Sequence, residues 1–126
     1  MVQKYIVNDI VMYKNRIHTI IDILASNGYE LSYVRHPVSP VRLSGVPLTP
    51  EILEKNGWYG ATHSKQSDNN TKILYKTFKR KGYPTIKVSQ DLKITCELSP
   101  FIVKLESVSD LQHLLFGLGI NHEMEV

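Results

Sequence analysis

The chain has 126 residues, of which 42% are hydrophobic, so it can bury a core as one domain or as two closely joined lobes. Fifteen Lys and Arg against twelve Asp and Glu leave a mild formal charge of +3. The single cysteine, Cys96, excludes an internal disulfide and favours a reducing compartment. No apolar run reaches the ~20 residues that cross a bilayer, and the N-terminal segment lacks the pattern of a secretory signal. We therefore expect a soluble protein of the cytoplasm.

Residues 1–48 are predicted to form short antiparallel strands. Two β-rich runs flank a tight turn at Lys14 and Asn15, and Asn27-Gly28 is a strong hairpin signal before a third run. Because three short strands leave exposed edges unless they close, we expect a small SH3-like β barrel. Four prolines follow within residues 37–50, which excludes a central strand or a helix interior and leaves room for one short strand at 40–45.

A short helix is predicted over residues 49–57, within the segment LTPEILEKNGW. Thr49 is a preferred N-cap, Pro50 suits the first helical position, and Gly57 suits the left-handed conformation that ends a helix. Two turns are too few to build a core, so we expect the adjacent isoleucine and leucine to pack toward the barrel. Trp58 should then cover the seam to a second lobe. These four named residues receive a structural role.

Residues 58–126 are predicted to form an antiparallel sheet covered by one terminal helix, an α+β arrangement. The polar stretch 59–72 indicates a mobile loop, and strands are expected within 72–81, 84–90 and 93–106. The helix should begin near Ser109, with Gln112 three residues on as in a capping box. Its apolar stripe should lie on the sheet and consists of Leu111, Leu114, Leu115 and Leu118.

Two segments, VPLTPEILEKNGW and SVSDLQHLLFGLGINHE, resemble motifs of an uncharacterised family of small proteins common in phages and prophages of gut bacteria. That family carries a P-L-T-x-E-x-L-x-K-x-G-F/W segment midway and a terminal V-H-x-L-Q-x-L helix, where Leu111, Gln112 and Leu114 match. Ser109 stands where the family usually has histidine, so no role of that histidine transfers. The resemblance spans most of the chain, implies a phage origin, and brings no known activity or catalytic residue.

Catalytic and metal-binding arrangements are not indicated by the sequence. Cys96 lies on the apolar side of a predicted strand, which favours a small core residue over a nucleophile. The five histidines lack metal-ligand spacing, and the closest pair, His113 and His122, flanks a helix end. We therefore expect no enzymatic activity, no cofactor and no bound metal.

Two binding functions are indicated instead. In the first, the protein binds and modulates a host protein in the host cytoplasm, for example in counter-defence. In the second, the basic segment 72–81 and the turn after it bind nucleic acid or a nucleotide signal, because aromatic rings there alternate with cations. The same lysines are an ordinary way to keep a strand edge soluble. The candidate binding residues are Lys76, Lys79, Arg80, Lys81 and Tyr83. Of these we expect the side chains of Lys76, Lys79 and Arg80 to be exposed, with Lys79 on the opposite face from the other two.

A minor virion component is a third alternative, and the sequence leaves the oligomeric state open. Salt dependence separates the two binding functions, because a phosphate binder loses affinity steeply with salt and an apolar protein interface does not.

Overall fold

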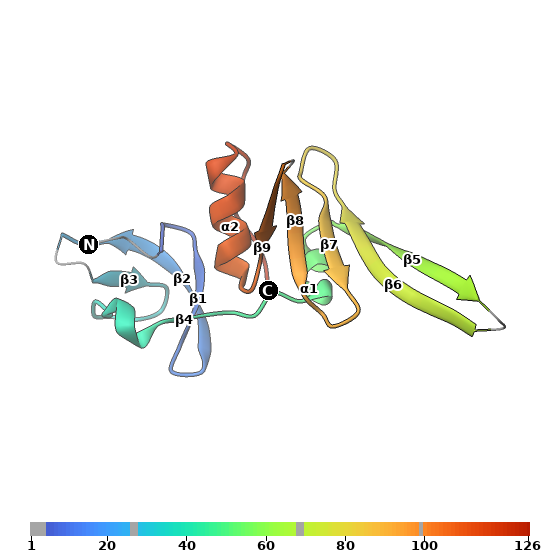
Figure 1. Ribbon diagram of the computed structural model, residues 1–126. Helices are drawn as coiled ribbons and strands as arrows, with labels where there is room; N and C mark the ends of the chain where they lie inside the picture. The colour runs from blue at the N-terminus through green and yellow to red at the C-terminus, as the bar shows by residue number, and fades with distance from the viewer. Residues whose placement is uncertain (1–4, 26–27, 68–69, 99) are drawn as a thin grey trace. The chain divides into compact units, whose positions relative to one another are not determined.

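The computed structural model describes residues 5–25, 28–67, 70–98 and 100–126, with the backbone alone for 63–67 and 70–74. The chain forms two compact units. The first unit comprises Met1–Pro47 and Ser107–Met124, and the second unit comprises Leu48–Glu106 and Glu125–Val126. Each is built on one antiparallel sheet and contains one α-helix (Figure 1). The predicted α+β class is confirmed.

The sheet of the first unit has four strands in the order β3-β2-β1-β4. They are β1 (Ile10–Tyr13), β2 (Arg16–Ile23), β3 (Tyr29–Leu31) and β4 (Ser44–Gly45), with a 3-10 turn η1 (Pro40–Arg42) before β4. The β1–β2 turn is the predicted one, because Lys14 and Asn15 have φ of 48° and 61°, as a type I′ turn requires. The predicted turn residue Asn27 lies outside the described residues.

The SH3-like barrel is not confirmed, because the first sheet does not close. Its edge strands are β4, which is two residues long and pairs with β1, and β3, which pairs with β2. The sheet instead buries a compact core on its own curved surface. That core consists of Tyr5, Val11, Tyr13, Ile20, Tyr29, Leu31, Val38 and Leu43.

Helix α2 (Val108–Gly117) packs in the first unit, against β1, so the sequence assigned it to the wrong sheet. The observed units also differ from the predicted boundaries at 1–48, 49–57 and 58–126, because residues 107–124 return to the first unit. An apolar stripe shows that a helix packs on something, but it does not show on which sheet.

The ends and the buried face of α2 also differ from the prediction. Its N-cap is Ser107, and Ser107 with Asp110 forms the capping box, two residues before the predicted start. Leu111 and Leu115 are buried as expected, whereas Leu118 is 44% exposed because it is the C-cap residue, beyond the last helical turn.

The sheet of the second unit is a five-stranded meander in the order β5-β6-β7-β8-β9. Its strands are β5 (Tyr59–Ser67), β6 (Asn70–Lys79), β7 (Ile86–Ser89), β8 (Ile94–Leu98) and β9 (Phe101–Lys104). The loop predicted at 59–72 is wrong, because this stretch forms β5 and the start of β6, paired from Tyr59 opposite Lys79 to Ser67 opposite Asn70. The backbone hydrogen bonds of a hairpin form whatever its side chains are. A prediction from side-chain composition therefore took this polar stretch for a loop.

One face of this second sheet is buried. Phe78, Ile86 and Cys96 lie side by side across β6, β7 and β8, and none of them is exposed. Gly60 pairs with Phe78, and a Cβ at Gly60 would come within 2.8 Å of the Phe78 ring, so glycine lets the ring lie across β5. Burial also raises the pKa of the Cys96 thiol, as expected of an inert core cysteine.

Helix α1 (Pro50–Lys55) belongs to the second unit and has the predicted ends. The Thr49 hydroxyl accepts a hydrogen bond from the Ile52 amide at 3.3 Å. At the other end Gly57 has φ +93°, and its amide and that of Trp58 donate back to the last helical turn, as in a Schellman motif.

The apolar pair of α1 packs inside the second unit rather than toward a barrel. Leu53 is fully buried, Ile52 is half-buried, and the Trp58 ring is 1% exposed. The Trp58 indole N–H donates to the Pro84 carbonyl at 3.4 Å, and its ring contacts Tyr83 edge to face. Trp58 is therefore a core residue of this unit, not the predicted cover of a seam.

Candidate functional site

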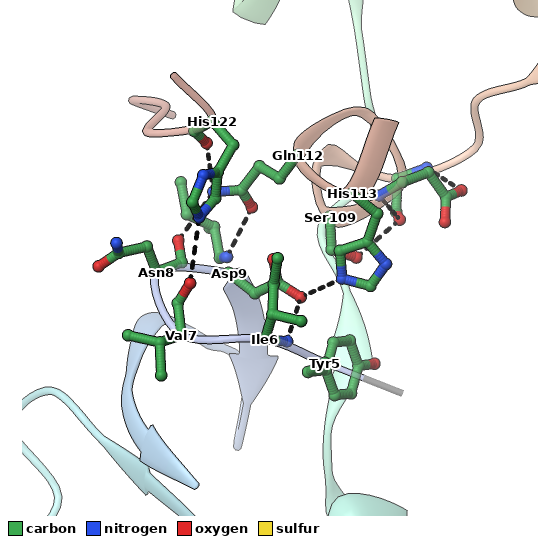
Figure 2. Close-up of polar contacts among 12 residues, drawn as sticks. Tyr5, Ile6, Val7, Asn8, Asp9, Ser109, Gln112, His113 and His122 are labelled. Atoms are coloured by element: carbon green, nitrogen blue, oxygen red, sulfur yellow. Dashed lines mark hydrogen bonds and ion pairs between the residues drawn. The ribbon is translucent and has the colours of Figure 1, made fainter. Parts of the chain in front are cut away.

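A polar cluster in the first unit joins the C-terminal helix to the turn that leads into β1 (Figure 2). The Gln112 side chain is fully buried, accepts a hydrogen bond from the Ile10 amide at 2.8 Å and donates one to the Asn8 carbonyl at 2.8 Å. Strand β4 pairs with β1 further along, at Val11 and Met12. The Gln112 amide therefore takes the place of a neighbouring strand beside residues 8–10.

Asp9 and His113 form the titratable part of this cluster. The Asp9 carboxylate is wholly buried, and its Oδ2 accepts from the Ile6 amide at 3.0 Å and pairs with Nε2 of His113. Its Oδ1 has no hydrogen-bond partner among the described residues. Burial raises the pKa of Asp9 above its ordinary value, although the Ile6 amide, His113 and His122 act in the opposite direction.

The contacts of this cluster indicate a structural role. Gln112 and His122 bond to backbone groups of the turn, and Asp9 receives His113 from the helix (Figure 2). These bonds close loops of about a hundred residues between the two ends of the chain. The capping-box role predicted for Gln112 belongs to Asp110 instead, and sequence reasoning missed that Gln112 is buried. The available signal was a polar residue on the same helix face as Val108 and Leu115, where a buried polar group needs a hydrogen-bond partner.

The predicted binding residues all lie in the second unit, but they do not form one surface. Lys76, Lys79 and Lys81 are exposed, whereas Arg80 and Tyr83 are half-buried. The guanidinium carbon of Arg80 lies 3.9 Å from the centre of the Tyr83 ring and 5.2 Å from that of Trp58. Arg80 is therefore held in a cation–π stack that supports the fold, rather than displayed as a free cation.

The face of the second sheet opposite Phe78 and Cys96 carries lysines, threonines and tyrosines. Paired residues of antiparallel strands point to the same side, so the register places one row across four strands. That row is Thr77, Lys87, Thr95 and Lys104, and the residues beside it on this face include Tyr59, Tyr75, Lys79, Glu97 and Ile102. We call these nine residues the lysine face.

The charged and aromatic groups of the lysine face are accessible. Lys79, Lys87 and Lys104 are exposed, and the Tyr59 ring is 79% exposed. The Lys87 ammonium lies 4.2 Å from the centre of the Tyr75 ring. Three exposed lysines therefore share one side of the sheet with the exposed Tyr59 and the half-buried Tyr75, and Lys79 is the predicted residue that belongs to it.

The charge of the chain is concentrated in the second unit. Residues 48–106 contain ten Lys and Arg and six Asp and Glu, whereas 1–47 and 107–124 together contain five of each. The excess lies in the basic segment 72–81, which has five Lys and Arg and no acid, whereas the rest of 48–106 has five Lys and Arg and six Asp and Glu; the first unit is neutral. Such an excess attracts polyanions.

A pocket of about 310 Å³ lies in the second unit, where β8 begins and β9 ends. Leu48, Ile94 and Leu105 contribute apolar surface, and Lys93 and Lys104 contribute positive charge. Thr95 and Glu106 also line it. Lys104 and Thr95 are members of the lysine face, so the pocket adjoins that face.

Other kinds of site find no support in the part of the chain that the structure describes. Its residues include no group of three His, Cys, Asp or Glu placed to share a metal ion. Neither of its helices has the length and apolar character needed to cross a membrane. Comparison with known proteins found no matching family model, no matching curated protein and no matching solved structure, so membership of the phage family stays a prediction.

Proposed function

We propose that the protein is a phage accessory protein without catalytic activity, whose second unit binds single-stranded nucleic acid on the lysine face. The observation that carries the proposal is the placement of Lys79, Lys87 and Lys104 with Tyr59 and Tyr75 on one accessible side of a sheet. The four-unit excess of positive charge in residues 48–106 supports it.

The geometry suits a single strand better than a duplex. Neighbouring strands lie about 4.8 Å apart, so the backbones of Lys87 and Lys104, two strands apart, are separated by about 10 Å, within reach of successive phosphates. The exposed Tyr59 ring offers stacking to an unpaired base, worth about 1–3 kcal/mol per base, and a paired base cannot use it.

The test is a titration of a labelled oligothymidylate of about 12 nucleotides, followed by fluorescence anisotropy at several salt concentrations. Three phosphate contacts predict a slope of log K against log salt of about −2. The triple variant Lys79→Ala, Lys87→Ala, Lys104→Ala should weaken binding and flatten that slope toward zero. The matched control is Lys76→Ala with Lys81→Ala, which removes exposed lysines outside the lysine face.

Two outcomes would overturn this proposal. One is an absence of oligonucleotide binding by the wild-type protein at about 50 mM salt, where phosphate contacts are strongest. The other is equal loss of affinity in the triple variant and in the control, which would show diffuse attraction to charge rather than a defined surface.

A second candidate function is the binding of a host protein. Phe101 and Ile102, on the edge strand β9, are 70% and 66% exposed, and large apolar side chains on an edge are typical of protein contacts. Affinity capture from nuclease-treated bacterial lysate tests it. A captured protein that is lost with Phe101→Ser and Ile102→Ser, but kept with the triple lysine variant, would favour this candidate over nucleic-acid binding.

A further inference from the structure

We infer that the pocket beside the lysine face receives a terminal nucleotide that carries a phosphomonoester, so that the second unit binds the phosphorylated end of a nucleic-acid strand. This inference rests on the proposed function and adds a position and an end preference to it.

The pocket is continuous with the lysine face. Thr95 and Lys104 belong both to the row across the sheet and to the lining of the pocket. A strand whose phosphates follow that row reaches the pocket at the edge of the sheet. The volume of about 310 Å³ is at the lower end of ligand pockets, which suits one nucleotide rather than several.

The pocket lining combines apolar and positively charged side chains. Leu48, Ile94 and Leu105 offer apolar surface to a base or sugar, and Lys93 and Lys104 offer charge to a phosphate. A phosphomonoester carries about −1.5 to −2 charges at neutral pH, more than a phosphodiester within the strand. The Lys93 ammonium lies 3.6 Å from the Asp91 carboxylate, but both side chains are largely exposed, so that weak ion pair leaves Lys93 able to bind a phosphate.

Leu92 also lines the pocket, and its backbone is in the left-handed conformation. Leu92 has φ +62° and is 72% exposed, in the three-residue turn closed by the Ser89 amide on the Lys93 carbonyl at 3.0 Å. Such turns favour glycine at this left-handed position. The fold alone therefore does not explain why a large apolar side chain is exposed to water on a strained backbone. A role of the Leu92 side chain as a contact surface for a bound base would explain it.

The experiment compares one oligonucleotide sequence in three forms: 5′-phosphorylated, 3′-phosphorylated, and with hydroxyl groups at both ends. One phosphorylated form should bind about fivefold more tightly than the hydroxyl form. Lys93→Ala should abolish that preference, so that all three forms bind equally. Lys87→Ala, the matched control on the lysine face, should weaken all three forms equally and preserve the preference.

Leu92→Gly separates ligand binding from folding. Because glycine relieves the strain at φ +62°, the melting temperature should stay equal or rise, while the preference for a phosphorylated end falls.

Each contrary result has a separate meaning. Equal affinity of the wild-type protein for all three forms overturns the inference and leaves the proposed function standing. No binding of any form overturns both. Free nucleoside monophosphate can be titrated in the same way, with its binding monitored by the backbone amide shifts of Leu92 and Lys93. If it binds there and no oligonucleotide binds, the ligand is a free nucleotide rather than a strand end, and the inference is overturned.

Discussion

The two units of this chain are stabilised in different ways. The first unit is neutral and is closed by buried polar side chains that span the sequence, such as Gln112 on Ile10, 102 residues apart. The second unit is a meander of strands that pair with their neighbours in the chain, and it carries the positive charge. The comparison shows that the locally paired sheet keeps lysines exposed on one face, whereas the unit closed by distant contacts uses its polar groups to hold itself together.

Leu115→Ala should have the largest effect, because it opens a cavity where α2 packs in the first unit. A loss of about 2–5 kcal/mol is expected for a fully buried leucine. Trp58, the only tryptophan, lies in the second unit, so its fluorescence follows that unit while far-UV circular dichroism follows both. In a urea titration the dichroism should shift more than the fluorescence. Equal shifts would show that the two units unfold together.

Gln112→Leu should destabilise the first unit by about 1–3 kcal/mol, because it keeps the volume but leaves the Ile10 amide and the Asn8 carbonyl unpaired. Hydrogen exchange at the Ile10 amide should accelerate while amides of β7 keep their protection. Unchanged exchange at Ile10 would mean that water or another group replaces the glutamine, and that this bond does not set the stability of the turn.

Gly57→Val should destabilise the second unit by about 1–2 kcal/mol, because a β-branched residue poorly tolerates the left-handed φ of +93°. A Cβ there would also lie 3.3 Å from Nε of Arg80, in the stack on Trp58. Gly117→Ala is the control: it lies in α2 with open space around it and should stabilise slightly. An unchanged melting temperature of Gly57→Val together with lost ligand binding would make this turn part of the functional surface.

Asp9→Asn should have the smallest effect, and that effect should depend on pH. The raised pKa of Asp9 means that its contribution to stability is present below the ordinary value of 3.8 and is lost as pH rises through the folded-state pKa. The variant should therefore gain stability relative to wild type from mildly acidic to neutral pH. Asp22→Asn, at an exposed acid on β2, is the control. Parallel pH profiles of Asp9→Asn and wild type would contradict the raised pKa.

Local features of this protein follow from the sequence alone. The cap at Thr49, the turn at Gly57 and the type I′ turn at Lys14-Asn15 each depend on the conformational preference of one or two residues, and each is present. The alternation of Ile86 and Val88 against Lys87 likewise predicts the buried side of β7. These signals act over a few residues, so no distant contact is needed to interpret them.

The partners of these elements were decided by the tertiary structure. The stripe of Leu111 and Leu115 fits either sheet, and the buried amide of Gln112 joins α2 to β1 in the first unit. The polar strand β5 forms because β6 supplies its hydrogen-bond partners. Lys87 and Lys104 lie on the same face because the register of β7, β8 and β9 places both of them opposite Thr95. Such pairings join residues far apart in the chain, and their free energy depends on which surfaces come into contact. A local pattern of residue types does not contain that information.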